Sequence, residues 1–252
     1  LLMTIDAPLL FCWGAALYTF WRMMEPGRRA SLWLLGAVLP VGLGLLSKQT
    51  MIGFLALGSV FLLTGREDRG QLFRPAYWIW VSGSLLFVAP VVWWNSRHDW
   101  ITLQHTGGHF TGDPVGWTKR ITRSAEFVAS QFAVLSPMTC FLLVTVVVAA
   151  MFAFRRLNRR ERYLLCFSGL PLVGVYLLSF TRRVEPNWPA PFYLAAMVLL
   201  VGRALEQFEL PLWLPLRKLE LTRATLVGAA TVAVAYLLPL NMGLQGSKLD
   251  AL

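Results

Sequence analysis

The stretch NSRHDWITLQHTGGHFTGDPVGWTKRITR, residues 95–123, is the one long run of the chain that cannot lie in hydrocarbon. It holds the three histidines of the protein, and charged side chains alternate in it with the rings of Trp100, Phe110 and Trp117. Long segments of this kind between apolar runs are usually either functional or disordered, and the aromatic residues favour order. The stretch therefore predicts an outer loop, 95–123, that meets a charged ligand at the edge of a membrane.

Composition places the rest of the chain in the bilayer. Hydrophobic residues make up 56% of the sequence, charged residues only 14%, and the mean hydropathy is +0.57, which is typical of an all-α integral membrane protein. The net charge of +10 comes from basic residues that cluster in short segments between apolar runs, so it indicates cytoplasmic loops and excludes a nucleic-acid partner. Cys12, Cys140 and Cys166 each fall within an apolar run, and no disulfide framework is implied.

The apolar runs predict a bundle of about eight membrane segments in one domain, 1–252. A spanning helix needs about 20 residues. The run 32–64 is longer and is interrupted at 47–50, so it predicts two short helices that meet near Lys48. Pro90 predicts a kink in the segment 77–95. The other predicted segments are 7–21, 126–154, 164–180, 192–201 and 225–240, with a cytoplasmic amphipathic connection at 203–223.

The basic clusters set the predicted orientation. They lie at 22–29, 66–74, 155–162 and 203–223, and the positive-inside rule assigns them to the cytoplasm. Asp6, Lys48, the 95–123 stretch and the 181–189 loop then share the outer side, as do both chain ends. The sequence has no initiator Met and enters an apolar run almost at once, so we expect an N-terminal part to be missing.

Two charged residues beside apolar runs are candidates for a functional site. A lysine in the middle of such a run is costly, which makes Lys48 a candidate, although a snorkelling lysine in a tight hairpin explains it as well. Asp6 precedes an apolar helix and would also serve as an ordinary N-cap.

Five strings resemble successive signatures of bacterial members of the protein O-mannosyltransferase-like superfamily: TIDAPLLFCWGAALY (4–18), GLGLLSKQT (42–50), WWNSRHDW (93–100), SQFAVLSP (130–137) and EPNWPAPFYLAA (185–196). These are C-type glycosyltransferases that include the lipid A aminoarabinose transferases. The resemblance extends to about residue 200, and 224–252 resembles only a membrane helix.

The resemblance implies transfer of a sugar from a polyprenyl-phosphate carrier to a lipid, glycan or protein hydroxyl, at the periplasmic face of the bacterial inner membrane. Lipid A modification and protein glycosylation in the cell envelope are the corresponding processes. The Asp-Glu pair of the family's first outer loop is absent, so the sequence resembles an incomplete copy of the enzyme. Asp6 matches an acid of the second outer loop, and Lys48 matches a basic position near the lipid phosphate.

Such a reaction needs an oriented acceptor hydroxyl, a group that takes its proton, and cations for the departing phosphate. We therefore expect Asp6 to be catalytic. The residues expected to bind the donor phosphate are Lys48, Arg97, Arg182 and Arg183. Those expected to bind substrate are His98, Asp99, Trp100, Glu185, Asn187 and Trp188. The cofactor is left unknown, with a divalent metal held by the acidic centre as one option.

Other interpretations stay open. A transporter or a flippase for lipid-linked sugars would also place charges inside a bundle, but it would carry a second interrupted helix pair like the one at Lys48. The loop 185–189 would also serve as an interface anchor. His105 and His109, with His98, Asp99 and Asp113, have the composition of a zinc site, yet Gly107 and Gly108 weaken the helix between them. Substrate-facing or exposed histidines are therefore preferred over a metal site.

Overall fold

The computed structural model describes residues 6–25, 27, 30–108, 116–209 and 218–241, and within them every regular element is a helix. The all-α class is therefore confirmed. The helices are α1 (Asp6–Met24), α2 (Ala30–Ser47), α3 (Ile52–Thr64), α4 (Pro75–Leu86), α5 (Ala89–Ser96), α6 (Ile101–Gly108), α7 (Trp117–Leu135), α8 (Pro137–Phe152), α9 (Arg159–Thr181), α10 (Ala190–Ala204) and α11 (Lys218–Asn241), with short 3-10 turns η1 (Gln49–Met51), η2 (Arg69–Phe73) and η3 (Phe154–Arg156).

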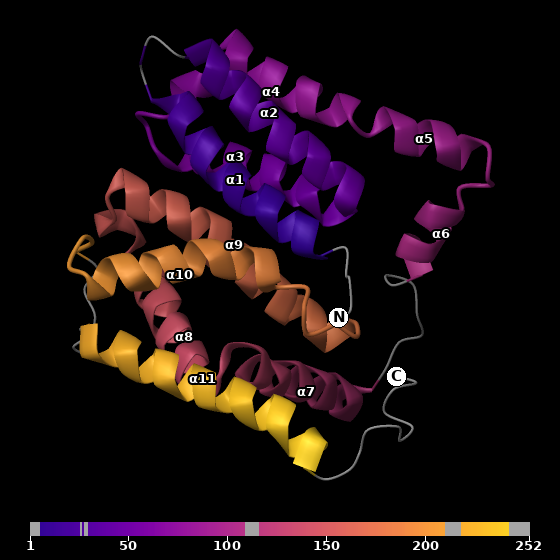
Figure 1. Cartoon of the computed structure of the whole chain (residues 1–252). Helices are drawn as coiled ribbons and strands as arrows, with labels where there is room; N and C mark the ends of the chain where they lie inside the picture. Colours follow the sequence, from indigo (N-terminus) through magenta and orange to yellow (C-terminus); the bar gives the residue numbers. More distant parts are fainter. Residues whose placement is uncertain (1–5, 26, 28–29, 109–115, 210–217, 242–252) are drawn as a thin grey trace.

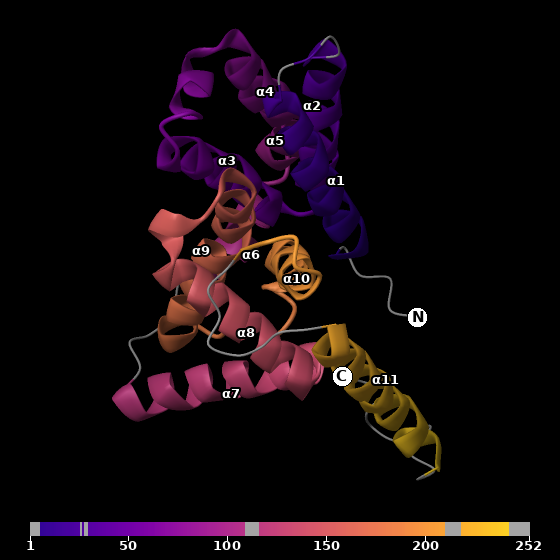
Figure 2. The same cartoon turned by 90° about the vertical axis from the view of Figure 1, so that its left-hand side faces the viewer.

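The helices form three tiers (Figures 1 and 2). The first tier holds α1 to α4, the middle tier holds α9 and α10, and α7 and α11 form the last, which α8 joins to the middle. Large rings fill the space between the first two tiers. The ring of Phe54 lies 5.2 Å from that of Trp13 and 4.6 Å from that of Phe167, and Phe20 lies 4.4 Å from Trp80. All five rings are completely buried, so aromatic packing joins the N-terminal helices to α9.

Among the described residues, two helical stretches are long and apolar enough to cross a membrane: Pro75–Ser96, made of α4 and α5, and Arg159–Thr181, which is α9. The bent pair α7–α8 adds a third if it is one span. Shorter apolar helices are Ser31–Ser47, Gln49–Thr64 and Ala190–Ala204. These helices mark a membrane protein, and the expected number of eight segments stays a prediction.

Two predicted helix breaks are confirmed. Lys48 has an extended backbone (φ −153°, ψ 133°) between α2 and η1, so the run 32–64 divides into two short helices there. The second break falls at Phe87 and Val88, between α4 and α5. Pro90 lies in the first turn of α5, where a missing N–H is tolerated, so the predicted kink takes the form of a short interruption just before the proline, within the stretch Pro75–Ser96.

The interpretation of 126–154 as a single helix is wrong. The chain bends by 111° between α7 and α8, at Ser136, whose φ is +67°. Pro137 begins α8, and a proline disfavours the helical conformation in the residue before it. The bend therefore follows from the Ser-Pro pair within the apolar run.

The stretch 95–123 is more regular than expected. α6 forms in its middle, and α7 begins at Trp117, before the predicted apolar run. Ser124, Phe127 and Gln131 recur at helical spacing on the buried face of α7, which explains why this charged sequence is helical. The location of 95–123 outside the membrane stays a prediction. The connection 203–223 is described only in part, because 210–217 lie outside the described residues; α11 starts before its end.

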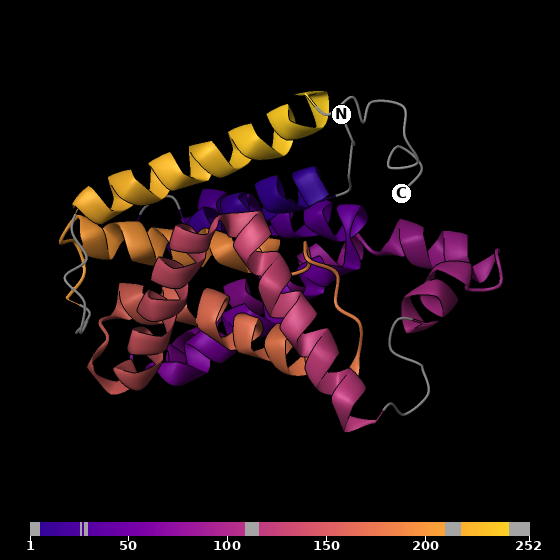
Figure 3. The same cartoon turned by 90° about the horizontal axis from the view of Figure 1, so that it is seen from below.

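The basic clusters and the candidate site lie at opposite ends of the bundle. The start of α1, the junction of α2 with α3 and the turn before α10 lie to the right in Figures 1 and 3, whereas the end of α1, the end of α3 and the start of α9 lie to the left. α5 and α6 extend away from the other helices, also to the right. This arrangement agrees with the predicted alternation of the loops.

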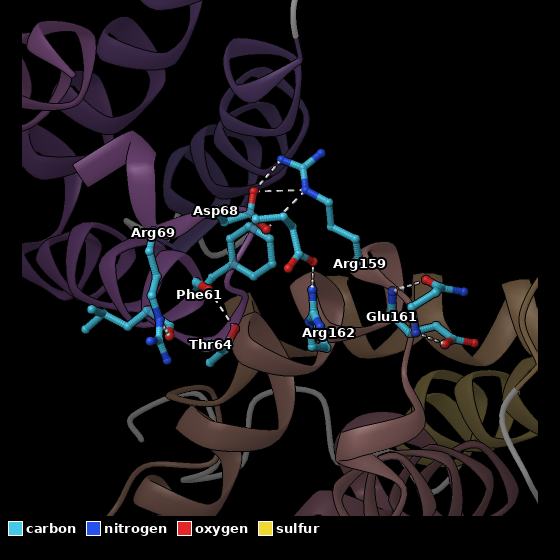
Figure 4. Close-up of polar contacts among 10 residues, drawn as sticks. Phe61, Thr64, Asp68, Arg69, Arg159, Glu161 and Arg162 are labelled. Atoms are coloured by element: carbon cyan, nitrogen blue, oxygen red, sulfur yellow. Dashed lines mark hydrogen bonds and ion pairs between the residues drawn. The ribbon is translucent and has the colours of Figure 1, made fainter. Parts of the chain in front are cut away.

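An ion-pair network ties the first tier to α9 at the basic end (Figure 4). Asp68, only 2% exposed, accepts from Nε and Nη2 of Arg159, and the Nη2 contact measures 2.8 Å. Arg162 pairs with Glu67 on the same loop. The N-terminus of α9 is itself closed by a capping box between Asn158 and Glu161. The basic cluster 155–162 thus has a structural role besides its charge.

Candidate functional site

Asp6 joins three segments that are far apart in the sequence. Its Oδ1 accepts a hydrogen bond from Lys48 Nζ at 2.7 Å, and its Oδ2 accepts from Asn187 Nδ2 at 2.5 Å. The side chains of Lys48 and Asp6 are 22% and 16% exposed, so the ion pair is largely shielded but open on one side. The structure therefore brings together one predicted catalytic residue, one predicted phosphate ligand and one predicted substrate ligand.

Local backbone geometry explains the position of each group. Asp6 is the first residue of α1, at the positive end of the helix dipole. Lys48 occupies the extended break between α2 and η1 and still donates its backbone N–H to Gly44 O at 2.9 Å. Asn187 lies on a tight turn closed by Trp188 N–H to Glu185 O at 3.1 Å, just before Pro189 caps α10.

The environment keeps Asp6 ionised. Burial raises the pKa of its carboxyl group, but the hydrogen bonds from Lys48 and Asn187 and the positive charge of Lys48 outweigh burial, so the pKa lies below its ordinary value. Asp6 lies outside the candidate spans. At neutral pH the site thus contains a carboxylate and an ammonium group in contact.

This arrangement differs from the expectation in one respect. A lysine in an apolar run needs an anionic partner, and we expected that partner to be a donor phosphate. In the structure the partner of Lys48 is Asp6. An ammonium group has three donors, and the bond to Oδ1 uses one of them. Lys48 can therefore hold Asp6 and an incoming phosphate oxygen together.

Behind Asn187, a buried amide holds the turn in place. Gln131, only 6% exposed, donates from Nε2 to Pro186 O at 3.4 Å and accepts from Tyr193 Oη at 2.7 Å. It thereby connects α7 and α10 to the residue that precedes Asn187. Gln131 was not among the predicted site residues; the signal that pointed to it was a polar amide beside an apolar run.

Four predicted site residues, 97–100, lie at the corner between α5 and α6, and their contacts are local. The guanidinium group of Arg97 lies 4.5 Å from the ring of Trp93, and the ring of His98 stacks on Trp94 at 4.1 Å. Asp99 and Trp100 both have positive φ, 50° and 57°. This strained turn redirects the chain from α5 into α6, so residues 97–100 have a conformational role there. The structure does not place them in contact with Asp6.

The remaining predicted residues surround the turn of Asn187. Arg182 caps the C-terminus of α9 and donates its N–H to Leu178 O at 2.8 Å. Arg183 is highly exposed, with Nε 3.8 Å from Glu185 Oε1. Trp188 is half-buried beside Asn187. These residues lie at the same end of the bundle as Asp6 (Figure 1).

The zinc hypothesis is tested only in part, because His109, Asp113 and the side chain of His105 lie outside what the structure describes. Within the part of the chain that the structure describes, no three His, Cys, Asp or Glu side chains converge on a possible metal position. The three cysteines are separate, buried thiols.

Similarity to known proteins indicates which kind of protein contains such a site. Residues 1–94, which include Asp6 and Lys48, match the family model described as dolichyl-phosphate-mannose-protein mannosyltransferase. Lipid A galacturonosyltransferase RgtD of Rhizobium johnstonii is 28% identical to the chain over 206 residues. The chain is similar to these glycosyltransferases over the matched regions. Both matches support the predicted family and the predicted enzyme class.

The alignment with RgtD covers 78% of this chain but 40% of RgtD, so the chain spans less than half of that relative's length. No solved structure matches the chain.

Proposed function

We propose that the chain forms part of the active site of a glycosyltransferase that moves a sugar from a polyprenyl-phosphate donor to a lipid A-type acceptor. The observation that carries this proposal is the contact of Asp6 with both Lys48 and Asn187 at the end of the bundle opposite the basic clusters. The name of the relative, a lipid A galacturonosyltransferase, favours a lipid acceptor over a protein acceptor.

The chemistry follows from the groups present. Asp6 would accept a hydrogen bond from the acceptor hydroxyl and take its proton as the oxygen attacks the anomeric carbon. The bond between that carbon and the phosphate oxygen breaks, and the electron pair leaves with the polyprenyl phosphate. Lys48 would stabilise the negative charge of this leaving group. Asn187 would hold the carboxylate in a fixed orientation, which lowers the cost of reaching the reactive geometry.

The location belongs to the same proposal. The chain would cross the bacterial inner membrane several times, with Asp6, Lys48 and Asn187 facing the periplasm and the basic clusters facing the cytoplasm. A donor whose phosphate lies at the membrane surface would reach Lys48 from the lipid phase. Support comes from the apolar helices and from the separation of the two ends.

A transporter of lipid-linked sugars is the second candidate, and the bend between α7 and α8 is the observation that favours it. This bend is a further helix interruption besides those at Lys48 and between α4 and α5. It lies at Ser136 and Pro137, however, and neither residue is charged.

The deciding experiment is a transfer assay. Full-length protein in proteoliposomes receives polyprenyl-phosphate sugars and lipid A, and the product is measured by mass spectrometry. We expect sugar to appear on lipid A and Asp6→Asn to lower the rate by about two to four orders of magnitude, as loss of a general base does. Glu25→Gln, an acid at the basic end, is the control and should leave the rate unchanged. Movement of intact donor across the bilayer without transfer would support the transporter instead.

A further inference from the structure

A polar cavity lies next to the candidate site, between α7 and the segment that leads to Asn187. It has a volume of about 570 Å³. Its lining residues are Lys119, Thr122, Arg123, Glu126, Phe127, Ser130, Arg183, Val184, Glu185 and Pro186. We call it the α7 cleft. Of its lining residues, Arg183 was predicted to bind the donor phosphate and Glu185 to bind substrate, but the cavity as a whole has no assigned role.

The cleft has an excess of positive charge. Lys119 and Arg123 are one helical turn apart on α7, and Arg183 faces them from the end of α9. Two carboxylates, Glu126 and Glu185, also line the cleft, so the cations outnumber the anions by one. Arg183 and Glu185 are 3.8 Å apart, longer than a hydrogen bond, which leaves the guanidinium group able to bind another anion. Two arginines suit bidentate binding of a phosphate.

The three faces of α7 indicate where the cleft lies. One face is buried through Ser124, Phe127 and Gln131, and a second carries the cleft residues. The third exposes large apolar side chains: Ile121, Val128 and Phe132. A helix with one charged face and one exposed apolar face is typical of a membrane surface. The cleft lies on the side of α7 away from these apolar side chains, so it faces the head groups of a membrane that takes up the apolar face.

The connection to the candidate site is direct. Pro186 lines the cleft, and the next residue, Asn187, binds Asp6. Only one phosphate of the reaction has to lie at the reacting centre, namely the leaving phosphate of the donor, which the proposed function places at Lys48. A phosphate bound in the cleft is therefore not the reacting group, and its binding energy serves to position another part of the same ligand.

We propose that the α7 cleft binds a phosphate on the head group of the glycolipid acceptor and so presents the acceptor hydroxyl to Asp6. This assignment rests on the proposed function. The carboxylates Glu126 and Glu185 are suited to accept hydrogen bonds from sugar hydroxyls around that phosphate.

The test is a binding measurement that needs no turnover. Native mass spectrometry of the detergent-solubilised full-length protein gives the Kd for three probes: bisphosphorylated lipid A, lipid A with both phosphates removed, and polyprenyl monophosphate. The variant is Arg123→Gln with Arg183→Gln. The matched control is Arg120→Gln with Arg156→Gln, which removes the same charge from residues that do not line the cleft.

We expect the cleft variant to bind bisphosphorylated lipid A at least about tenfold more weakly, because charge-assisted bonds to phosphate are lost. Binding of the dephosphorylated lipid and of polyprenyl phosphate should stay unchanged, as should all binding by the control. The assignment would be overturned if the cleft variant bound bisphosphorylated lipid A as tightly as the wild type, or if it lost as much affinity for the dephosphorylated lipid. It would also be overturned if the control variant lost as much affinity, or if the cleft variant lost affinity for polyprenyl phosphate alone.

Two further measurements separate loss of phosphate binding from loss of folding and from loss of transfer activity. Thermal unfolding shows whether the double variant is folded, and Lys119→Gln alone replaces it if it is not. A protein that binds phosphorylated lipid A through the cleft but transfers no sugar would refute the proposed function and leave the binding site in place.

Discussion

Lys48 Nζ lies 2.7 Å from Asp6 Oδ1, although 42 residues separate the two in the chain. The other carboxylate oxygen binds Asn187, 181 residues away. One carboxylate therefore connects the start of α1, the break after α2 and the turn before α10. Because each bond to Asp6 comes from a different segment, each can be removed separately by mutation.

Lys48→Met should mainly weaken donor binding, whereas Asp6→Asn should mainly lower turnover. Loss of an ammonium–phosphate contact is worth about 1.5–3 kcal/mol, which corresponds to a roughly tenfold or larger increase in the Kd for polyprenyl phosphate. Asp6→Asn keeps the shape of the site but removes the base. Donor binding by native mass spectrometry and transfer rates separate the two effects. Near-normal transfer by both variants, at normal expression, would show that neither residue takes part in the reaction. Lys48 would then be a snorkelling lysine and Asp6 a helix cap.

The contribution of Asp6 to stability should depend on pH in one direction. Its pKa is lower in the folded protein than the ordinary value of about 3.9, so the ionised form stabilises the fold above that value. The stabilisation is lost as the pH falls through the lowered, folded pKa. We expect the difference in Tm between wild type and Asp6→Asn to be constant above about pH 5 and to shrink below about pH 4. A difference that disappears between about pH 6 and pH 7 would contradict the lowered pKa.

Gln131→Leu should slow catalysis because it removes a support of the turn that carries Asn187. The substitution removes the donor to Pro186 O and the acceptor for Tyr193 Oη, and both hydrogen bonds are partly buried. Each hydrogen bond contributes about 0.5–1.5 kcal/mol. We expect a lower Tm, a lower kcat and an unchanged Kd for the donor. Tyr193→Phe removes only the hydroxyl group and should have the smaller effect on kcat. An unchanged kcat in Gln131→Leu would limit this residue to a structural role.

Arg159→Gln should destabilise the protein without affecting the chemistry of the site. It leaves the carboxylate of Asp68, which is 2% exposed, without its bidentate partner. Asp68 is buried but Arg159 is 29% exposed, so we expect a loss of about 1–3 kcal/mol. Arg160→Gln, an exposed neighbour on the same helix, is the control. Thermal unfolding measures the loss, and the transfer rate per folded molecule should equal that of the wild type.

Cysteine labelling tests the proposed orientation. The three native cysteines are buried, so the background from a membrane-impermeant maleimide should be low. Glu185→Cys should be labelled from outside intact cells, and Arg156→Cys should be labelled only after permeabilisation. Both positions are exposed, so accessibility depends only on the side of the membrane. Labelling of position 156 from the outside would reverse the orientation.

Several features were predictable because they depend on local sequence. The division of the run 32–64 at Lys48 followed from its excess length and from a charged residue in its middle. The bend at Ser136 was missed although the sequence contains Pro137. The apolar composition of 126–154 favoured one helix, whereas the effect of a proline on the residue before it decided the bend. The helix at Trp117 was missed because its charged residues hid a buried face with helical spacing.

By itself, the sequence determined the membrane class, the all-helical class, the separation of basic from less basic loops, and the candidacy of Asp6, Lys48 and Asn187. These properties follow from the transfer free energy of successive residues and from local motifs, which neighbouring residues decide. Only the tertiary structure decided that Asp6 is the partner of Lys48, that Gln131 supports the turn of Asn187, and that Lys119, Arg123 and Arg183 line one cleft. Such contacts depend on how helices pack across long separations in the chain, and the spacing of residues along one helix carries no information about which face of another helix it meets.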